Sequence, residues 1–247
     1  MKPMAPPDTA LYAIGDLHGC LDLLQDMQRL IAEDADRRAA SRRIVVYLGD
    51  YISRGADSRG VVERVCEWLP PGFERITLKG NHEDLLLRFL GGEVDTGRHW
   101  LDYGGIEAMA AYGVMIADSL ARDDATLLEL RAGLEAALPA EHLDFLRGLR
   151  ISHRAGDYFF VHGGVRPGVP LETQSARDCM WIRKTFLDSE VDHGAVVVHG
   201  HSISAAPELR HNRIGIDTGA YRSGVLTCLV LEGGHRELLQ TGTAVTT

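Results

Sequence analysis

Three short apolar segments in the first third of the chain each end in a glycine that is followed by an acidic or amide residue. They are "ALYAIGD" (10–16), "RIVVYLGD" (43–50) and "FERITLKGN" (73–81). Each is followed by a segment with apolar residues at helical spacing, at 20–33, 58–69 and 82–90. Strands that alternate with helices indicate βαβ units and a mostly parallel sheet. Ligands of open α/β sheets bind beyond the carboxyl ends of the strands, so the three endings are expected to converge on one place.

The middle of the chain, from about residue 93 to 150, has a different pattern. It is rich in Ala, Leu, Glu and Arg at helical spacing and carries no cluster of potential ligands. We expect a helical insert or cap there that covers part of the site. Further strands are expected at 157–164, 195–202, 212–219 and 224–233. No repeat or linker interrupts the chain, which predicts a single domain over residues 1–247.

Composition narrows the classes of function. A hydrophobic share of 45% and a charged share of 25% are ordinary for a globular protein. The net charge of −9 argues against a general nucleic-acid-binding protein, and no nucleic-acid partner is expected. No segment is long and apolar enough to suggest a membrane span or a signal peptide, so no membrane partner is expected. The four scattered cysteines lack a C-x-x-C pair, which favours free thiols and a cytoplasmic location. We expect a monomer or a weak oligomer.

Side chains that can bind metal follow several of the expected strands. They are Asp16 and His18 in "GDLHG", Asp50 in "GDYISRG", Asn81 and His82 in "GNHE", His162 in "VHGG" and His201 in "HGHS". Oxygen and imidazole ligands without thiolates suit Mn²⁺, Fe or Zn²⁺. Each motif alone is weak, because D-x-H is common, "GNHE" could be a helix cap and His162 could be a core histidine. Together, in this order, they predict a metal site in which Asp50 could bridge two ions.

The series "GDLHG…GDYISRG…GNHE…HGG…GHS" resembles the signature of the calcineurin-like metallophosphoesterases. It is most similar to the phosphoprotein phosphatase family, in the small bacterial and phage branch that also includes the symmetrical diadenosine tetraphosphatases. The resemblance spans about residues 11 to 219. It implies an α/β fold, a four-layer αββα sandwich with a helical insert or cap. It also implies two divalent metal ions, with Mn²⁺ expected first and Fe or Zn²⁺ as alternatives.

The resemblance also assigns roles to the metal-binding residues. Asp16 and His18 would bind the first ion, and Asp50 would bridge the two. Asn81, His162 and His201 would bind the second ion. His201 is preferred to the neighbouring His199 because the family pattern is Gly-His-Ser/Thr, although the sequence leaves an exchange of the two histidines open.

The remaining roles concern catalysis and phosphate binding. His82 would be the general acid, and Arg54 would contact the phosphoryl oxygens together with Asn81. Arg183 in "CMWIRK" matches the usual place of a second phosphate-binding arginine, with Arg166 and Arg177 as alternatives. The implied reaction is direct attack on phosphorus by a hydroxide that bridges the two metals. His82 would then protonate the departing oxygen.

Three functions remain open at this stage. The first is a metal-dependent phosphatase that acts on phosphomonoesters: phosphoserine or phosphothreonine in proteins and peptides, phosphotyrosine as an alternative, and aryl phosphates. The second is a dinucleoside polyphosphate hydrolase of the bis(5'-nucleosyl)-tetraphosphatase type. The third is an inactive metal-binding interaction module, which is disfavoured because every expected ligand and both arginines are present.

Ser53 bears on the first two functions. Protein-phosphatase members usually carry Asp at this position, and that carboxylate orients the general-acid histidine and raises its pKa. The nucleotide-cleaving branch commonly has a small residue there. Ser53 carries no charge, so His82 is expected to be a less supported acid unless Asp84 or another carboxylate replaces the missing partner. In contrast, "GNHE" is more similar to the protein-phosphatase members than to the nucleotide-cleaving branch.

Several other residues have less specific patterns. Trp100 and Tyr103, in the expected cap, could line a substrate groove but are interpreted as core residues. Whether Tyr221, just after "IDTG" (216–219), faces the site is left open. The motif "IDTG" follows His201 at the interval that is usual in the family. A single copy of it does not indicate an aspartic protease. Cys20, at the start of a helix, is interpreted as a packing residue.

Overall fold

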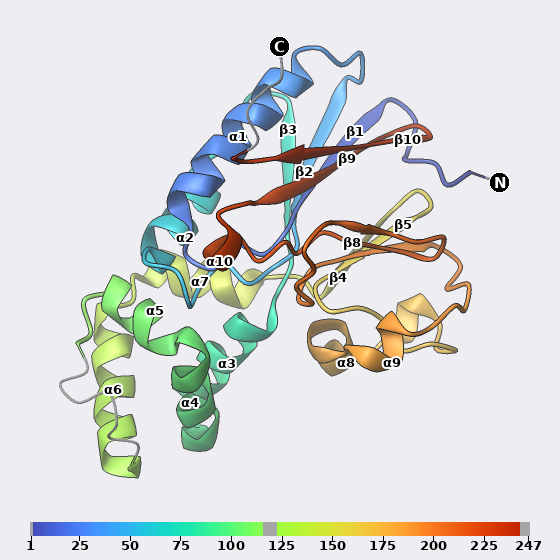
Figure 1. Cartoon of the computed structure of the whole chain (residues 1–247). Helices are drawn as coiled ribbons and strands as arrows, with labels where there is room; N and C mark the ends of the chain where they lie inside the picture. The colour runs from blue at the N-terminus through green and yellow to red at the C-terminus, as the bar shows by residue number, and fades with distance from the viewer. Residues whose placement is uncertain (1, 116–122, 243–247) are drawn as a thin grey trace.

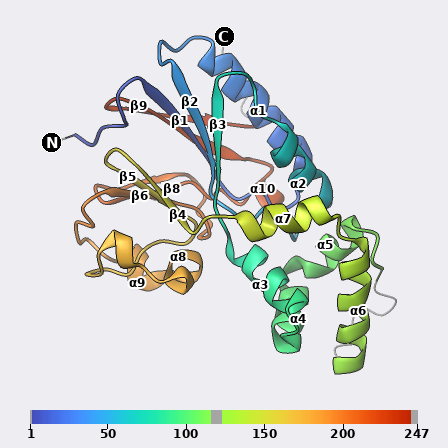
Figure 2. The same ribbon diagram turned by 180° about the vertical axis from the view of Figure 1, so that it is seen from behind.

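The computed structural model describes residues 2–115 and 123–242 and contains two five-stranded mixed sheets that pack face to face (Figures 1 and 2). The first sheet has the order β10-β9-β1-β2-β3. Its strands are β1 (Thr9–Ile14), β2 (Arg42–Tyr47), β3 (Phe73–Thr77), β9 (Thr227–Glu232) and β10 (His235–Gln240). Strands β1, β2 and β3 are parallel, as the alternation with helices predicted, and β9 and β10 join antiparallel.

The second sheet has the order β4-β5-β6-β8-β7. Its strands are β4 (Ser152–Ala155), β5 (Tyr158–Val161), β6 (Val196–His199), β7 (Glu208–Leu209) and β8 (Arg213–Gly215). Strands β5, β6 and β8 are parallel, whereas β4 and β7 pair antiparallel at the two edges. The carboxyl ends of the parallel strands of both sheets therefore provide the loops in which the candidate ligands lie.

The alternation of side chains along the strands builds the layers. In β1, Tyr12 and Ile14 pack against helices, whereas Leu11 lies between the two sheets. In β5, Phe160 lies between the sheets, and Phe159 packs on the opposite, outer face. Successive residues of a strand point to opposite faces, so fully apolar strands can bury both of their faces.

Helices cover the outer face of each sheet. Helices α1 (Leu21–Ala35) and α2 (Ser58–Glu67) cover the first sheet, and α8 (Ala176–Trp181) and α9 (Lys184–Leu187) cover the second (Figure 1). The predicted four-layer αββα sandwich is confirmed.

Helices from the middle of the chain lie beside α3 (Asn81–Leu90), below the end of the first sheet in Figure 1. They are α4 (Val94–Trp100), the short π-helix η1 (Leu101–Gly105), α5 (Ile106–Ala111), α6 (Asp124–Ala137) and α7 (Ala140–Gly148). Two further short helices, the 3₁₀ helix η2 (Leu171–Thr173) and α10 (Ala220–Ser223), lie in loops of the second half. Residues 94–111, which form α4, η1 and α5, are called the cap helices below.

The structure contains elements that the sequence pattern did not predict. Strands β4, β7 and β10 are short or polar and lie at sheet edges, and α8 to α10 have at most six residues each. All four cysteines are free thiols, as predicted. Burial raises the pKa of Cys20 to about 11, in agreement with a packing role. Within residues 2–115 and 123–242, none of the helices combines the length and the apolar character needed to span a bilayer.

Candidate metal centre and phosphate-binding site

The predicted ligands converge beyond the carboxyl ends of the strands. Asp16 and His18 follow β1, Asp50 follows β2, Asn81 and His82 begin α3, and His162 and His201 follow β5 and β6. All seven side chains are buried. A cavity of about 290 Å³ is lined by five of them: His18, Asp50, Asn81, His82 and His201.

Asp50 occupies the centre of the arrangement. Its Oδ2 lies 3.4 Å from Nε2 of His18 and 3.9 Å from Nε2 of His82, and its Oδ1 lies 3.4 Å from Nε2 of His162. Two groups of potential ligands, in each of which the ligating atoms lie within 4.8 Å of one another, share this carboxylate. They are His18, Asp50 and His82, and Asp50, His162 and His201. The two oxygens of Asp50 thus face two sets of ligating atoms, the geometry that a bridging carboxylate requires.

The histidines are oriented through their second ring nitrogen. Nδ1 of His18 lies 3.0 Å from the carbonyl oxygen of Ile52, and Nδ1 of His162 lies 3.0 Å from that of Leu48. When Nδ1 of His18 carries the proton and donates it to a carbonyl, Nε2 is left with its lone pair facing the cluster, an arrangement typical of metal-binding histidines. Nε2 of His162 lies 2.9 Å from Oδ1 of Asn81. Burial opposes protonation of His162, but the Asp50 and Asp16 carboxylates raise its pKa to about 10, so a cation bound here would displace a proton from Nε2.

Unpartnered polar atoms show that the residues fit a cation. Among the described residues, the buried Oδ1 of Asp16 and the buried Nε2 of His201 have no hydrogen-bond partner. Burial and the nearby Asp217 raise the pKa of Asp16. Burial lowers the pKa of His201 to about 2, so this imidazole is neutral and can donate a lone pair. Buried polar atoms without partners are costly, and a divalent cation would satisfy both of these.

The backbone at the site is strained. Five non-glycine residues here have φ between 43° and 76°: His18, Asp50, Ser53, Arg54 and His201. The left-handed region costs about 1–2 kcal/mol for each such residue. Strain of this kind is retained where surrounding contacts fix the conformation.

Glu83 supplies such contacts and was not predicted as a functional residue. Its buried carboxylate accepts hydrogen bonds from the backbone amides of Asp50, Tyr51, Ile52 and Gly80 at 2.9–3.3 Å. Burial and the Asp50 carboxylate raise the pKa of Glu83, and the amides oppose that rise. The sequence signal was its place at the third position of α3, where an acid typically caps a helix. Glu83 therefore holds the loop that carries Asp50.

Asp217 is a second residue that sequence reasoning missed. It lies in "IDTG", lines the same cavity as Asp50 and is buried. Burial raises its pKa, and the Asp50 carboxylate adds to that rise. The signal was present, because this acid also follows a buried strand, β8, near its end. The site thus holds three buried carboxylates, Asp16, Asp50 and Asp217, which a cation would stabilise.

Arg54 lies beside His82 at the mouth of the cavity. Its Nη2 is 3.4 Å from Nε2 of His82, and its guanidinium carbon is 4.8 Å from the centre of the Tyr221 ring. The guanidinium also donates to the Tyr221 hydroxyl. The backbone amide of Arg54 donates to the carbonyl of Gly104 in η1 at 3.1 Å, so a cap helix holds this residue. Tyr221 lines the cavity and therefore faces the site.

Arg183 is the second arginine at the cavity, and its Nη1 donates to the carbonyl of His201 at 2.9 Å. The two alternatives lie elsewhere. Arg166 is paired with Asp178, and Arg177 lines a neighbouring cavity.

The two competing histidines are also separated. The ring of His199 packs against Phe186 on the outer face of the second sheet, with ring centres 5.1 Å apart. His201 lies with Asp50 and His162 instead.

Neither Ser53 nor Asp84 supports His82. The Ser53 hydroxyl accepts a hydrogen bond from Nε1 of Trp100 at 2.9 Å, and Asp84 accepts one from Trp181 at 3.4 Å. Nδ1 of His82 is buried and has no partner in the described part of the chain. Trp100 is a core residue as predicted. The prediction of a core position is wrong for Tyr103, which is 50% exposed and lines a small cavity with Arg54 and His82, because η1 turns its side chain toward the site.

The chain is similar to known proteins in sequence and in fold. Residues 10–221 match the model of the calcineurin-like phosphoesterase family. The chain is 34% identical over 159 residues to the symmetrical bis(5'-nucleosyl)-tetraphosphatase of Dechloromonas aromatica (strain RCB), a match that covers 64% of this chain and 45% of that protein. The chain thus matches slightly less than half the length of this relative. A match to the symmetrical enzyme of Ralstonia nicotianae (strain ATCC BAA-1114 / GMI1000) covers 93% of this chain and 92% of that protein at 24% identity.

Further matches agree with the observed fold. The asymmetrical bis(5'-nucleosyl)-tetraphosphatase PrpE of Bacillus mycoides (strain KBAB4) is 25% identical, over 87% of this chain and 88% of that protein. Among solved structures, a putative diadenosine tetraphosphatase superposes with a TM-score of 0.63 at 19% identity, covering 97% of this chain and all of that one. A cold-active protein tyrosine phosphatase superposes with a TM-score of 0.56 at 17% identity, over 96% of this chain and 81% of that one. At these identities the two structures establish the likeness of fold.

Proposed function

The chain belongs to the calcineurin-like phosphoesterase family, and we propose that it is a metal-dependent phosphoesterase that hydrolyses the phosphoanhydride bonds of dinucleoside polyphosphates. One observation carries this choice of substrate. His82, the expected general acid, has no carboxylate on Nδ1, since Ser53 is bonded to Trp100 and Asp84 to Trp181. A phosphoanhydride releases a phosphate, a good leaving group that needs little help from an acid, whereas a serine phosphate releases a poor alkoxide. The names of the sequence relatives support the same choice.

The roles that we propose for the side chains follow from their positions. Arg54 and Arg183 bind the phosphoryl oxygens from two sides of the cavity, where guanidinium groups form charge-assisted hydrogen bonds. Asn81 lies at the same cavity and orients the phosphoryl group. His82 holds the proton that the leaving oxygen takes.

Two divalent cations, Mn²⁺ first among the candidates, would supply charge neutralisation and a more acidic bound water. The residues that we propose to hold them are Asp16, His18, Asp50, Asn81, His162 and His201. The cavity also contains Arg222 in addition to Arg54 and Arg183. Together with bound cations, these three guanidinium groups would offset Asp50 and Asp217, which line the same cavity, and attract a polyphosphate.

A phosphomonoesterase is the second candidate. The cavity of about 290 Å³ can hold one phosphoryl group with a small alcohol or phenol, and both arginines would bind it in the same way. This reading accommodates aryl phosphates, or phosphorylated peptides and proteins, as substrates. An inactive module is disfavoured, because the ligating atoms and both arginines meet at one cavity.

One experiment separates these functions. The enzyme is loaded with Mn²⁺, and in parallel with Fe²⁺ or Zn²⁺, and assayed on diadenosine tetraphosphate, p-nitrophenyl phosphate and a phosphoserine peptide. We expect kcat/KM for the dinucleotide to exceed that for the peptide by about 100-fold or more, because the poorer leaving group depends on general acid catalysis. A larger value for the peptide would establish the phosphomonoesterase instead. Lack of turnover of all three substrates with each metal would favour the inactive module.

A further inference from the structure

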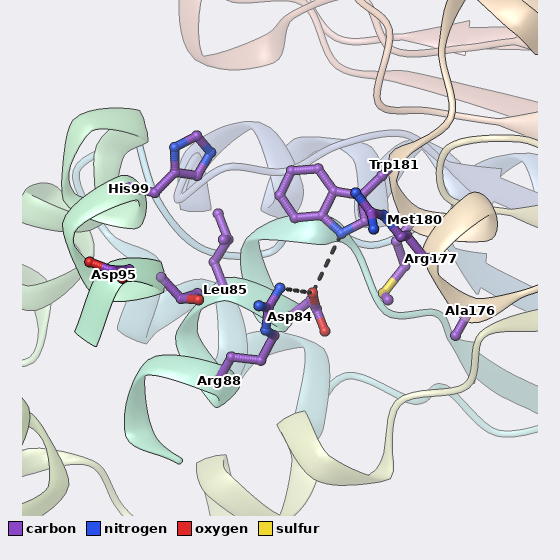
Figure 3. Close-up of a pocket in the computed structure, with 10 residues that line it drawn as sticks. Asp84, Leu85, Arg88, Asp95, His99, Ala176, Arg177, Met180 and Trp181 are labelled. Atoms are coloured by element: carbon purple, nitrogen blue, oxygen red, sulfur yellow. Dashed lines mark hydrogen bonds and ion pairs between the residues drawn. The ribbon is translucent and has the colours of Figure 1, made fainter. Parts of the chain in front are cut away.

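A second and larger cavity lies beside the metal centre. It has a volume of about 610 Å³ and is bounded by α3, α4 and α8 (Figure 3). Leu85 and Asp84 come from α3, His99 from α4, and Met180 and Trp181 from α8. A volume of this size lies within the range of about 300–1,000 Å³ that is usual for small-molecule sites.

This cavity continues into the metal site. A smaller cavity of about 200 Å³ shares Leu85, His99 and Trp181 with it. The same small cavity shares Arg54, His82 and Arg183 with the metal site. The three spaces therefore adjoin one another, and together they are called the groove below. The groove runs from the phosphate-binding arginines to the gap between the cap helices and α8.

The two ends of the groove differ in chemistry. Guanidinium groups of Arg54 and Arg183 line the metal end. The far end presents the indole of Trp181, the imidazole of His99, two carboxylates, Asp84 and Asp95, and the guanidinium group of Arg177. Asp95 is paired with Arg98. Figure 3 shows the indole of Trp181 and the ring of His99 on opposite sides of the space above Leu85. Arg88, which also lines this end, is paired with Asp84 and Glu93.

Aromatic side chains continue along the same wall, and their positions are fixed. The rings of His99 and Tyr103 have centres 4.5 Å apart, and Tyr103 lines the connecting cavity. The Trp181 indole donates to Oδ2 of Asp84 at 3.4 Å, as the dashed line in Figure 3 shows. Flat, partly exposed aromatic faces beside a phosphate site suit the stacking of a planar base.

We propose that the far end of this groove binds the nucleoside base of a dinucleoside polyphosphate while its phosphates lie at the metal end. This inference rests on the proposed function, which it deepens by naming the residues that select the nucleoside. Trp181 and His99 stack on the base, and Asp84 and Asp95 accept hydrogen bonds from its amino group or from ribose hydroxyls.

Variants at the far end test the assignment. Trp181→Leu and His99→Ala remove the two stacking surfaces, and His211→Ala is the control, since His211 is an exposed histidine that pairs with Glu190 and lines neither the groove nor the metal site. We expect KM for diadenosine tetraphosphate to rise about tenfold in Trp181→Leu and severalfold in His99→Ala, as expected when base stacking is lost. The ratio of kcat/KM for diadenosine tetraphosphate to that for p-nitrophenyl phosphate, which has no base, should fall severalfold in His99→Ala. The control should change neither substrate.

Two measurements distinguish loss of the base-binding site from an indirect effect on the metal site. The Trp181 ring lies 6.5 Å from that of His201, so Trp181→Leu could disturb the metal site. A parallel loss of activity on p-nitrophenyl phosphate in Trp181→Leu would reveal that disturbance. The KM of His99→Ala for the dinucleotide would then decide whether the groove binds the base. An unchanged KM for the dinucleotide in both variants would overturn the proposal. A raised KM for the phosphoserine peptide, with none for the dinucleotide, would overturn it in favour of a peptide groove.

Binding without turnover distinguishes this inference from the proposed function. The metal-loaded protein is titrated calorimetrically with a diadenosine tetraphosphate analogue whose bridging oxygens are methylene groups, and with inorganic tripolyphosphate. We expect the analogue to bind at least about tenfold more tightly than tripolyphosphate, and Trp181→Leu to abolish the difference. If this holds while the dinucleotide is not hydrolysed, the base site stands and the proposed function fails. If the dinucleotide is hydrolysed but the two ligands bind equally, the function stands and the base site fails.

Discussion

Ser53 is fully buried, and its hydroxyl accepts the indole N–H of Trp100 rather than facing His82. Ser53 is thus used here to attach a cap helix to the loop of Asp50 and Arg54. His82 retains its approach to Asp50 Oδ2 at 3.9 Å and to Arg54, but Nδ1 is left without a partner among the described residues. The identity of one small residue therefore changes how strongly the acid is supported.

The role of His82 can be tested by varying the leaving group. His82→Asn removes the transferable proton and keeps a side chain of similar size. We expect kcat/KM to fall by about 10²–10⁴ on a phosphoserine peptide and by much less on p-nitrophenyl phosphate, whose phenolate leaves without protonation. The measurement is kcat/KM for both substrates in both proteins. Equal losses would show that His82 does not act as the general acid.

The bond between Ser53 and Trp100 can be measured with a double-mutant cycle. Ser53→Ala leaves the buried indole N–H unpaired, and we expect it to lower the free energy of unfolding by about 1–3 kcal/mol. Trp100→Phe removes the donor together with packing volume. If the bond is formed, adding Ser53→Ala to Trp100→Phe should cost about 1 kcal/mol less than adding it to the wild type. Urea unfolding of the four proteins gives this coupling, and additive effects would contradict it.

Most residues of the candidate site could be predicted because each stands at the end of an apolar strand beside a glycine. Glu83 and Asp217 were missed for a physical reason. The role of Glu83 depends on four backbone amides from two loops, and those contacts exist only after folding. The motif around Asp217 resembles an ordinary turn, and only the second sheet brings it to Asp50. The separation of His199 and His201 likewise arises only on folding: His199 is the last residue of β6 and packs against Phe186, whereas His201 lies beyond the strand, where the backbone turns at a φ of 63°.

Among the structural elements, η1 links the cap helices to the phosphate-binding loop. Gly104 in η1 has φ of 99°, and its carbonyl accepts the amide of Arg54. A Cβ at this position would lie 2.5 Å from the backbone nitrogen of Arg54. The glycine therefore allows the close approach of two backbones at the point where Arg54 is held.

Two glycine substitutions separate backbone strain from the placement of Arg54. Gly104→Ala and Gly113→Ala both put a side chain at positive φ, but a Cβ at Gly113 meets nothing within 4 Å. We expect Gly113→Ala to cost about 1–2 kcal/mol of unfolding free energy and to retain its activity. Gly104→Ala should also lower kcat/KM for p-nitrophenyl phosphate about tenfold or more, because a small displacement of Arg54 weakens transition-state binding. Similar activities in the two variants would show that η1 does not position Arg54.

The elements that the pattern predicted are those with their own periodicity, such as β1, β2, β5 and α1. The edge strands β4 and β10 carry polar sequences, "SHRA" and "HRELLQ", and are extended because a neighbouring strand pairs with them. Helix α8 is too short to show a periodic pattern, although it carries Trp181. Contacts with neighbouring elements determine the conformation of such segments, and their local sequence does not predict it.

In the molecule as a whole, the site lies where the two sheets meet, and its buried carboxylates repel one another. Removal of metal is therefore expected to destabilise the whole fold. At 100 times its dissociation constant, a bound ion stabilises a protein by about 2.7 kcal/mol. That corresponds to about 5–10 °C in Tm for a chain of this size.

Calorimetric scans of one protein preparation with excess Mn²⁺ and with EDTA would measure this shift. In Asp50→Asn, which removes the shared carboxylate, the shift should be much smaller. An identical Tm with and without metal in the wild type would contradict a metal centre at these residues.

The meeting of two sheets at one site also sets an order of events during synthesis. β1 pairs with β9, which lies far downstream in the sequence and leaves the ribosome much later. At about 5–20 residues per second, Asp50 and Asn81 are exposed for several seconds before His162 and His201 emerge. The nascent chain carries half of a binding site during that interval, with carboxylate and amide oxygens that hold cations only weakly. Capture of the ions therefore waits until His201 has left the ribosome.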